Sequence, residues 1–222
     1  MTKLILALHD DVADVLTSAG FRAQLAAAGA TALQVNLDDP DVAPAMRFGP
    51  GRPITAIVSV WTASEAAAVV AAVADATDES DLHAYRVDER RRLDPPPVPD
   101  GERADALANV AVLRRPESMS REEYLEYWMV SHTPIAIRTQ ATFGYVQNIV
   151  EEPLTPGSPE ISAIVEELFP MAAMTDPHAF YGSGGDEAEL NRRFTELMAS
   201  VARFGADKGL DLVPTSRYLW SV

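Results

Sequence analysis

The alternation of apolar and polar positions predicts the same succession of elements twice along the chain. Short runs rich in Val, Ile and Leu are typical of strands, and apolar residues spaced three and four apart indicate helices. The predicted strands are residues 3–8, 31–37, 54–61, 82–87, 109–115, 143–150, 160–169 and 212–222. The predicted helices are residues 12–28, 63–76, 121–132 and 175–206, with interruptions at Gly20 in the first and at 182–185 in the last. Each half therefore has the order β-α-β-β-α-β.

A boundary between the halves is predicted by a charged run followed by prolines. Residues 88–92 are all charged, and residues 95–99 read Pro-Pro-Pro-Val-Pro. Proline has no backbone N–H and fits neither a helix interior nor a central strand, so this segment indicates a stiff, extended linker. We therefore expect a first half over residues 1–92, a linker over 93–107 and a second half over 108–222.

The repeated order also predicts how the halves pack. A four-stranded sheet covered by two helices on one face leaves its other face apolar and exposed to water, which is unfavourable. Two such sheets in one chain can bury these faces against each other. The expected fold is therefore α+β, a barrel-like intramolecular pseudo-dimer of two halves packed sheet to sheet. Whether two chains associate further into a homodimer stays open.

Composition narrows the range of partners. The 222-residue chain is 47% hydrophobic, which is enough to bury a substantial core. Its formal net charge of -15 argues against nucleic acid or an anionic membrane as a partner, because both attract clustered cations. The chain has no Cys, which excludes disulfides, thiolate catalysis and Cys-ligated metal centres. No apolar run has membrane-spanning length and no leader-like segment is visible, so we expect a cytoplasmic protein.

Candidate chemistry concentrates in the segment that begins at Ser120. Ser120 and Glu123 fit a capping box, which predicts the start of a helix. The apolar stripe of that helix contains Trp128 and leads to His132, and Pro134 then disfavours helical geometry, so His132 is expected in the last turn. An imidazole gives or takes a proton near neutrality, and a helix C-terminus favours its cation, which makes His132 a candidate general acid or base. The alternative is a structural His that bonds a backbone carbonyl at the helix end.

The strand over residues 143–150 carries three further polar candidates. Tyr145 and Gln147 share one strand face, and Asn148 lies on the other. If the first face looks into the barrel, a phenol and an amide are available to orient a carbonyl or hydroxyl group. If it faces the helices, Tyr145 is a packing residue and Asn148 is the inward polar group.

Three aromatic or imidazole side chains have two interpretations each. Trp128 is either a core residue or, with His132 beside it, part of a pocket wall. His178 and Tyr181 flank the start of the last long helix, where they either reach the mouth of the second-half barrel or only begin the helix. We include all three among the candidate ligand-binding residues.

Other familiar chemistry is absent from the sequence. The Gly-rich run at 182–185 lacks the Lys-Ser/Thr of a phosphate-binding loop, and no G-x-S-x-G nucleophile elbow is present. His9 and His83 have no neighbouring carboxylate at metal-ligand spacing. We therefore expect neither a metal nor a cofactor.

The order of a strand, a helix with Trp128, then His132 and Pro134, then a strand with Tyr145 and Asn148 resembles the EthD family. The resemblance covers about forty residues and implies the fold of that family, a dimeric α+β barrel of ferredoxin-like subunits. It further implies a cofactor-independent lyase or isomerase that dehydrates, cyclises or shifts a proton on a small aromatic or polyketide-like carbonyl compound. His132 is then the acid or base, Tyr145 the orienting phenol, and Trp128 with Tyr181 the apolar wall.

The first half departs from this pattern, because its first helix contains neither a Trp nor an H-x-P sequence. The resemblance therefore implies one site per chain, in the second half, with the first half as a scaffold that closes the sheet stack. Two alternatives stay open. One is a cofactor-free monooxygenase or a haem-binding enzyme of the same superfamily, with His132 or His178 as axial ligand. The other is a module that binds a small molecule without altering it.

Overall fold

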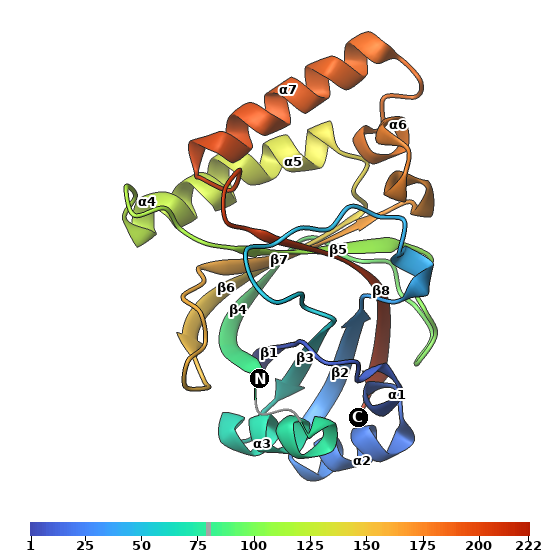
Figure 1. Cartoon of the computed structure of the whole chain (residues 1–222), viewed down its shortest axis with the longest axis vertical. Helices are drawn as coiled ribbons and strands as arrows, with labels where there is room; N and C mark the ends of the chain where they lie inside the picture. Colours follow the sequence, from blue (N-terminus) through green and yellow to red (C-terminus); the bar gives the residue numbers. More distant parts are fainter. Residues whose placement is uncertain (79–80) are drawn as a thin grey trace.

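The computed structural model describes residues 1–78 and 81–222, and within them eight strands close into one antiparallel barrel (Figure 1). The strands are β1 (Thr2–Leu8), β2 (Ala30–Leu37), β3 (Ala56–Thr62), β4 (His83–Leu93), β5 (Leu107–Leu113), β6 (Gly144–Pro153), β7 (Ala163–Phe169) and β8 (Asp211–Ser221). Around the barrel their order is β1-β3-β2-β8-β5-β7-β6-β4. Each half contributes four adjacent strands, and the β2–β8 and β4–β6 pairs join the halves.

Helices cover the two opposite outer faces of this barrel (Figure 1). They are α1 (Ala13–Leu16), α2 (Ala19–Ala27), η1 (Pro40–Val42), α3 (Ala66–Thr77), α4 (Arg121–Glu126), η2 (Tyr127–His132), α5 (Thr133–Thr139), η3 (Met171–Met174), α6 (Pro177–Tyr181) and α7 (Glu187–Arg203). The arrangement confirms the predicted α+β fold, in which two ferredoxin-like halves bury their sheets against each other as a pseudo-dimer. In the described part of the chain, no helix combines the length and apolar character needed to cross a membrane.

The barrel interior has an apolar layer and a charged layer. The apolar layer consists of Ile5, Ile57, Tyr85, Val87, Val110, Val112, Val150, Ile161 and Ile164. In the charged layer, Arg217 Nε lies 3.2 Å from Glu166 Oε1, and both side chains are buried. The amides of Gln34 and Asn36 donate to the same Glu166 oxygen at 2.9 and 2.8 Å. Glu166 is therefore buried with its charge compensated, as a charge in a protein interior has to be.

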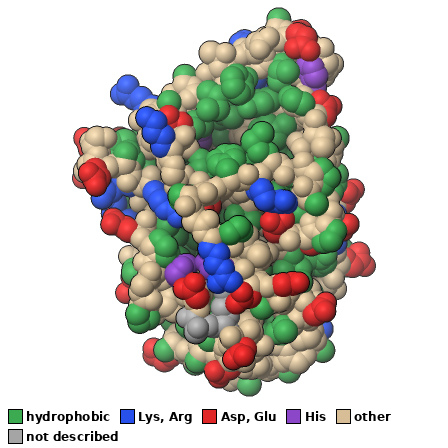
Figure 2. All heavy atoms as spheres, viewed as in Figure 1, with side chains coloured by type: hydrophobic (Ala, Val, Ile, Leu, Met, Phe, Trp, Pro, Cys, Tyr) green, Lys and Arg blue, Asp and Glu red, His purple; other side chains and the backbone are tan. Residues whose placement is uncertain are grey.

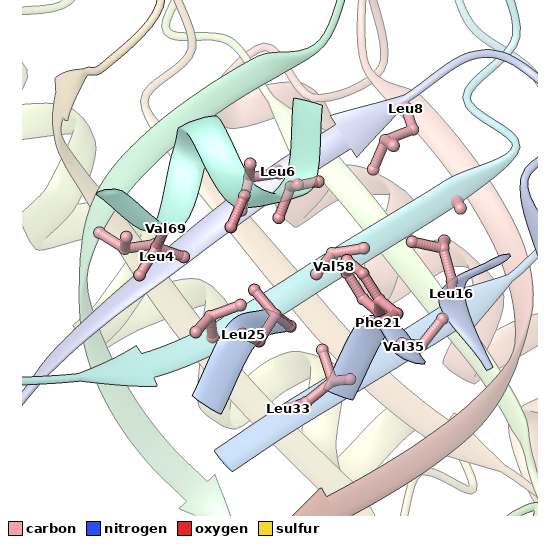
Figure 3. Packing of buried hydrophobic residues seen from close by; sticks show 14 of the residues in the cluster. Leu4, Leu6, Leu8, Leu16, Phe21, Leu25, Leu33, Val35, Val58 and Val69 are labelled. Carbon is pink, nitrogen blue, oxygen red and sulfur yellow. The ribbon is translucent and has the colours of Figure 1, made fainter. Parts of the chain in front are cut away.

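The space between the first-half sheet and its helices is filled by a dense apolar core (Figure 3). Leu6 of β1 and Val58 of β3 meet Phe21 and Leu25 of α2 and Val69 of α3, and each of these residues is at most 2% exposed. The alternating pattern of the first half thus places its large apolar side chains on the face of the sheet that the helices cover.

The first helix is interrupted at a different place from the one predicted. The break falls at Ser18, whose side chain accepts a hydrogen bond from Phe21 N at 3.1 Å and caps α2. Gly20 lies inside α2. A Ser with extended backbone satisfies a free N–H at a helix start, and this local gain outweighs the weak helix propensity of a single Gly.

The charged run over residues 88–92 is part of β4, which continues to Leu93, and is not a boundary between elements. Alternation explains this. Glu89 points into the barrel, where Lys3 Nζ lies 2.7 Å from its carboxylate, and Arg90 on the outer face donates to Asp88. A strand accommodates a dense charged run when its inward charge finds a buried partner and the others remain in water.

Candidate functional site

The second half has a cavity of about 560 Å³ between its sheet and its helices. Figure 2 shows hydrophobic side chains gathered around a hollow in the upper part of the molecular surface in this view. The wall is mainly apolar, and its aromatic members are Phe48, Trp128, Tyr145, Phe180, Tyr181, Phe194 and Phe204. The equivalent space in the first half is filled by its core, so the two halves differ at this interface.

A segment of the first half also lines this cavity. Ala45, Met46 and Phe48 lie between η1 and β3, and all three contribute to the wall. Phe48 N donates to Leu212 O at 3.3 Å, and Leu212 N donates to Phe48 O at 2.7 Å, which ties the segment to the start of β8. The first half is therefore more than the scaffold that we expected, because it supplies part of the site.

The floor of the cavity carries a row of three polar side chains on neighbouring strands. Glu167 of β7 is paired with Tyr145 of β6 on one side and with Asn109 of β5 on the other. All three line the cavity. Because directly paired residues of adjacent strands point to the same face, the carboxyl, phenol and amide are close neighbours.

Glu167 has an unusual environment for an acidic residue. It keeps some accessible surface, and since it lines the cavity, that surface faces the hollow instead of the bulk solvent. Burial raises its pKa to about 8. With its amide nitrogen turned toward the carboxyl, Gln140 at the end of α5 donates to Glu167 Oε1 at 3.1 Å. Glu167 therefore exchanges its proton near neutral pH.

Tyr145 is held in its protonated form. Its side chain is 1% exposed, and burial together with the neighbouring Glu167 carboxyl raises its pKa well above the ordinary value, although the side chains of Thr133 and Trp128 act in the opposite direction. Asn109 is also buried, and its Oδ1 has no hydrogen-bond partner among the described residues. At neutral pH the floor thus presents donors, a phenol and a carboxylic acid.

His132 reaches the cavity because the helix before it widens. The predicted capping box is present, with Ser120 Oγ accepting from Glu123 N and the Glu123 carboxylate accepting from Ser120 N. After α4, residues 127–132 form a π-helical turn, in which Thr133 N and Oγ1 both bond to Trp128 O. Pro134 has no N–H to donate to the preceding turn, which favours such a widening. π-Helical turns occur frequently at functional sites.

The position of His132 differs from the prediction. The helix continues through α5 to Thr139, so His132 is not in a last turn and no helix C-terminus favours its cation. Its ring is 7% exposed, lies 4.6 Å from the ring of Phe204, and has Nδ1 3.0 Å from Ser200 Oγ. Burial lowers its pKa to about 4. His132 is therefore a neutral imidazole at neutral pH, and its Nε2 has no partner among the described residues.

The structure brings some of the predicted site residues together and separates others. His132, Tyr145, Trp128 and Tyr181 all line the cavity. Tyr145 does so although its strand face looks toward the helices, because the cavity lies on that side of the sheet.

Three predicted ligand-binding residues lie outside the cavity. Gln147 is buried and donates to Thr133 Oγ1 at 2.9 Å. Asn148 faces the barrel interior and donates to Ile164 O at 3.2 Å. His178 contacts Ser183 Oγ at 2.6 Å and Glu187 at 3.3 Å, which fixes the turn between α6 and α7. The structure therefore does not bring these three side chains to the cavity, although Gln147 Oε1 and Asn148 Oδ1 are buried and have no hydrogen-bond partner among the described residues.

Sequence reasoning missed Glu167, Asn109 and Gln140. For Glu167, the strand alternation did contain a signal. Residues 163, 165 and 167 share a strand face, so continuing the apolar alternation of Ala163 and Val165 places a carboxyl on a buried face. Asn109 follows by the same alternation in β5. Gln140 gave no signal, because only the fold brings the end of α5 above β7.

The cavity does not fit a haem group. Haem carries two carboxylates that need cationic or donor partners, whereas the cavity lining, within the described residues, contains Glu167 and Asp207 and no Lys or Arg. His178, one of the two axial ligands considered, lies outside the lining. In the part of the chain that the structure describes, no group of three or more His, Asp or Glu side chains is placed to hold a metal ion.

Fold and cavity together define a dimeric α+β-barrel protein in which one chain supplies both halves. Among solved structures, the chain is similar to an anthrone oxidase-like protein, with a TM-score of 0.54, 10% sequence identity, and coverage of 99% of this chain and 92% of that one. It is also similar to a proposed monooxygenase from Fusobacterium nucleatum subsp. nucleatum, with a TM-score of 0.50, 9% identity, and coverage of 99% and 94%. No family model matches the chain, and no curated protein matches it. At these identities the similarity shows a shared fold, and the EthD resemblance rests on its motif alone.

Proposed function

We propose that this protein is a cofactor-independent lyase or isomerase that moves a proton on a small, uncharged and largely apolar carbonyl compound. The observation that supports the proposal is the presence, in one apolar cavity, of a neutral imidazole and of a carboxyl group that titrates near neutral pH. These are His132 and Glu167. Groups whose surroundings shift their pKa values in this way are typical of acid and base chemistry.

The lining of the cavity favours an uncharged ligand. Its aromatic walls suit a flat ring system, which the volume of about 560 Å³ accommodates. An anionic ligand would meet Glu167 and Asp207 and would find no Lys or Arg among the described lining residues. Burying an unpaired charge is strongly unfavourable, so carboxylates and phosphates are disfavoured.

The proposed reaction assigns one proton to each group. The carbonyl oxygen of the substrate accepts a hydrogen bond from the protonated Glu167, with the Tyr145 phenol beside it. His132 Nε2 takes the proton from the carbon next to the carbonyl, and the donors on the floor stabilise the charge that develops on oxygen. The proton then returns to another carbon in an isomerisation, or leaves with a hydroxyl group as water in a dehydration.

Deuterium exchange of 2-tetralone tests this proposal without knowledge of the natural substrate. This bicyclic ketone has acidic protons next to its carbonyl, and their replacement in D₂O is followed by proton NMR. We expect the protein to accelerate exchange and His132→Asn to lose about 100-fold or more of that acceleration. His178→Asn is the matched control, because His178 lies outside the cavity, and it should retain full activity. Binding of 2-tetralone without faster exchange would reject the enzymatic proposal in favour of a binding module.

A second candidate function, cofactor-free oxygenation, begins with the same removal of a proton from the substrate by His132. Two of the solved structures with this fold are described as anthrone oxidase-like and as a proposed monooxygenase. When His132 removes a proton from the substrate, a carbanion forms on the substrate. Reaction of that carbanion with O₂ instead of a proton would oxidise the substrate and reduce O₂, which is cofactor-free oxygenation. Uptake of O₂ during incubation with ketones, measured with an oxygen electrode, distinguishes this chemistry from isomerisation.

A further inference from the structure

The side of His132 that faces away from the cavity is connected to two hydroxyl groups. His132 Nδ1 lies 3.0 Å from Ser200 Oγ on α7, and the same Oγ lies 3.3 Å from the hydroxyl oxygen of Tyr127. Ser200 is 4% exposed, whereas Tyr127 is only half-buried. The three side chains therefore form a continuous hydrogen-bonded path from the cavity to the half-buried Tyr127.

The π-helical turn creates this path. Tyr127 and His132 are its first and last residues, five positions apart, and in a π-helix residues at that spacing lie above one another. In a regular α-helix they would point in different directions. Phe204 holds the pair in place, with its ring 6.0 Å from that of Tyr127 and 4.6 Å from that of His132. The guanidinium of Arg203 lies 5.9 Å from the Tyr127 ring.

We propose that His132, Ser200 and Tyr127 form a proton relay between the cavity and the solvent. The relay rests on the proposed function in one respect, since it assumes that His132 exchanges a proton with the bound ligand. His132 Nε2 gains the proton from the ligand while Nδ1–H passes its proton to Ser200 Oγ. The Ser200 hydroxyl passes its own proton to the Tyr127 oxygen, and the Tyr127 hydroxyl releases its proton to water. Each residue of the relay gains one proton and loses one, so the imidazole ends as its other neutral tautomer, and one proton passes from the ligand to water.

Because His132 is buried, a relay would allow its ring to accept a proton without becoming charged. An imidazolium in this position is unfavourable, because burial lowers the pKa of His132 to about 4. With a partner at Nδ1 that accepts a proton, the ring takes a proton at Nε2 without carrying two at once. Hydroxyl groups act as donor and acceptor, so the same path also works in the opposite direction. Ser200 and Tyr127 are positioning residues, since they act through His132 and do not touch the ligand.

Exchange of the His132 ring N–H with water tests the relay. The protein is labelled with ¹⁵N-histidine, the cavity is filled with 2-naphthol, and the signal is assigned by its loss in His132→Asn. Ser200→Ala and Tyr127→Phe each interrupt the path, and we expect about tenfold slower exchange or more in both. Ser200→Thr keeps a hydroxyl and should exchange at nearly the wild-type rate.

Tyr124→Phe is the matched control. Tyr124 lies on α4, its ring is 5.7 Å from that of the same Phe204, and its hydroxyl has no hydrogen-bond partner among the described residues. Loss of this hydroxyl should leave the exchange rate unchanged. Equal rates in wild type, Ser200→Ala and Tyr127→Phe would overturn the relay. Because this measurement needs no turnover, it remains decisive even if 2-tetralone proves inert and the proposed function fails.

Discussion

Glu167 lies directly opposite Tyr145 in the β6–β7 ladder, and both side chains face the same cavity. The pairing places a carboxyl and a phenol next to each other under apolar walls. Burial raises the pKa of both groups, that of Glu167 to about 8. The charge of the cavity floor at physiological pH therefore depends on the single proton of Glu167.

Glu167→Gln should stabilise the protein at alkaline pH. The ordinary pKa of Glu is near 4.5 and the folded value is about 8. As the pH rises from 4.5 to 8, the unfolded chain releases this proton and the folded protein retains it, so wild-type stability falls by up to about 4 kcal/mol. The Gln side chain does not titrate, so the variant does not lose stability over this pH range. Urea unfolding at pH 4 and pH 8.5 should show a gain only at the higher pH, and a gain of equal size at both would contradict the assignment.

Glu166→Gln, one residue away, should have the opposite effect. Glu166 faces the barrel interior and compensates the buried Arg217. Removing its charge leaves the guanidinium without a counter-ion and should cost about 3 kcal/mol near neutral pH. Thermal unfolding at pH 7 measures this loss. Addition of Arg217→Met should restore part of it, whereas no recovery in the double variant would mean that the loss has another origin.

His132 should make the protein less stable in acid. Its pKa is 6.5 ordinarily and about 4 in the folded protein. As the pH falls from 6.5 to 4, the unfolded chain takes up a proton that the folded protein does not, which removes about 3 kcal/mol of stability. His132→Asn, whose amide can retain the contact to Ser200, should lack this slope. The measurement is the difference between the two stability curves across that range, and parallel curves would argue against a neutral buried imidazole.

Filling the cavity should abolish ligand binding without unfolding the protein. Ala111 of β5 lines the cavity, so Ala111→Phe should lower the affinity for 2-naphthol about tenfold or more while changing stability by about 1 kcal/mol or less. Ala108 is the matched control on the same strand, because it is fully buried and faces the barrel interior. Ala108→Phe should overpack that interior and cost about 3 kcal/mol. Calorimetric titration and thermal unfolding give both quantities.

Binding of a neutral ketone should weaken as the pH rises through about 8. The protonated Glu167 donates a hydrogen bond to the carbonyl oxygen, and its carboxylate cannot. Titration of 2-tetralone against the intrinsic fluorescence of the protein at pH 6 and pH 9 measures this effect. Glu167→Gln keeps an N–H donor at all pH values, so its affinity should not change over the same range. A decline of equal size in wild type and variant would place the titrating group elsewhere.

The sequence by itself determined the positions of the strand cores, the order of strands and helices in each half, and the fold class, but not the continuation of the helix through α5. Apolar alternation fixes which residues form strands, and two β-α-β-β-α-β halves with exposed apolar sheet faces have one economical way to bury them. It also located the helix start at Ser120 and placed His132, Trp128 and Tyr145 near one site, since these depend on local capping and spacing.

Tertiary structure alone decided what surrounds those residues. A strand pattern does not show which polar residue across a ladder is its neighbour, so Glu167 joined Tyr145 and Asn109 only when β5, β6 and β7 paired. Burial keeps His132 neutral where the sequence predicted a cation favoured by a helix C-terminus, and α7 brought Ser200 to it across sixty-eight positions of sequence. The physical reason is that pKa values and hydrogen bonds depend on burial and on distances through space, which local periodicity does not encode.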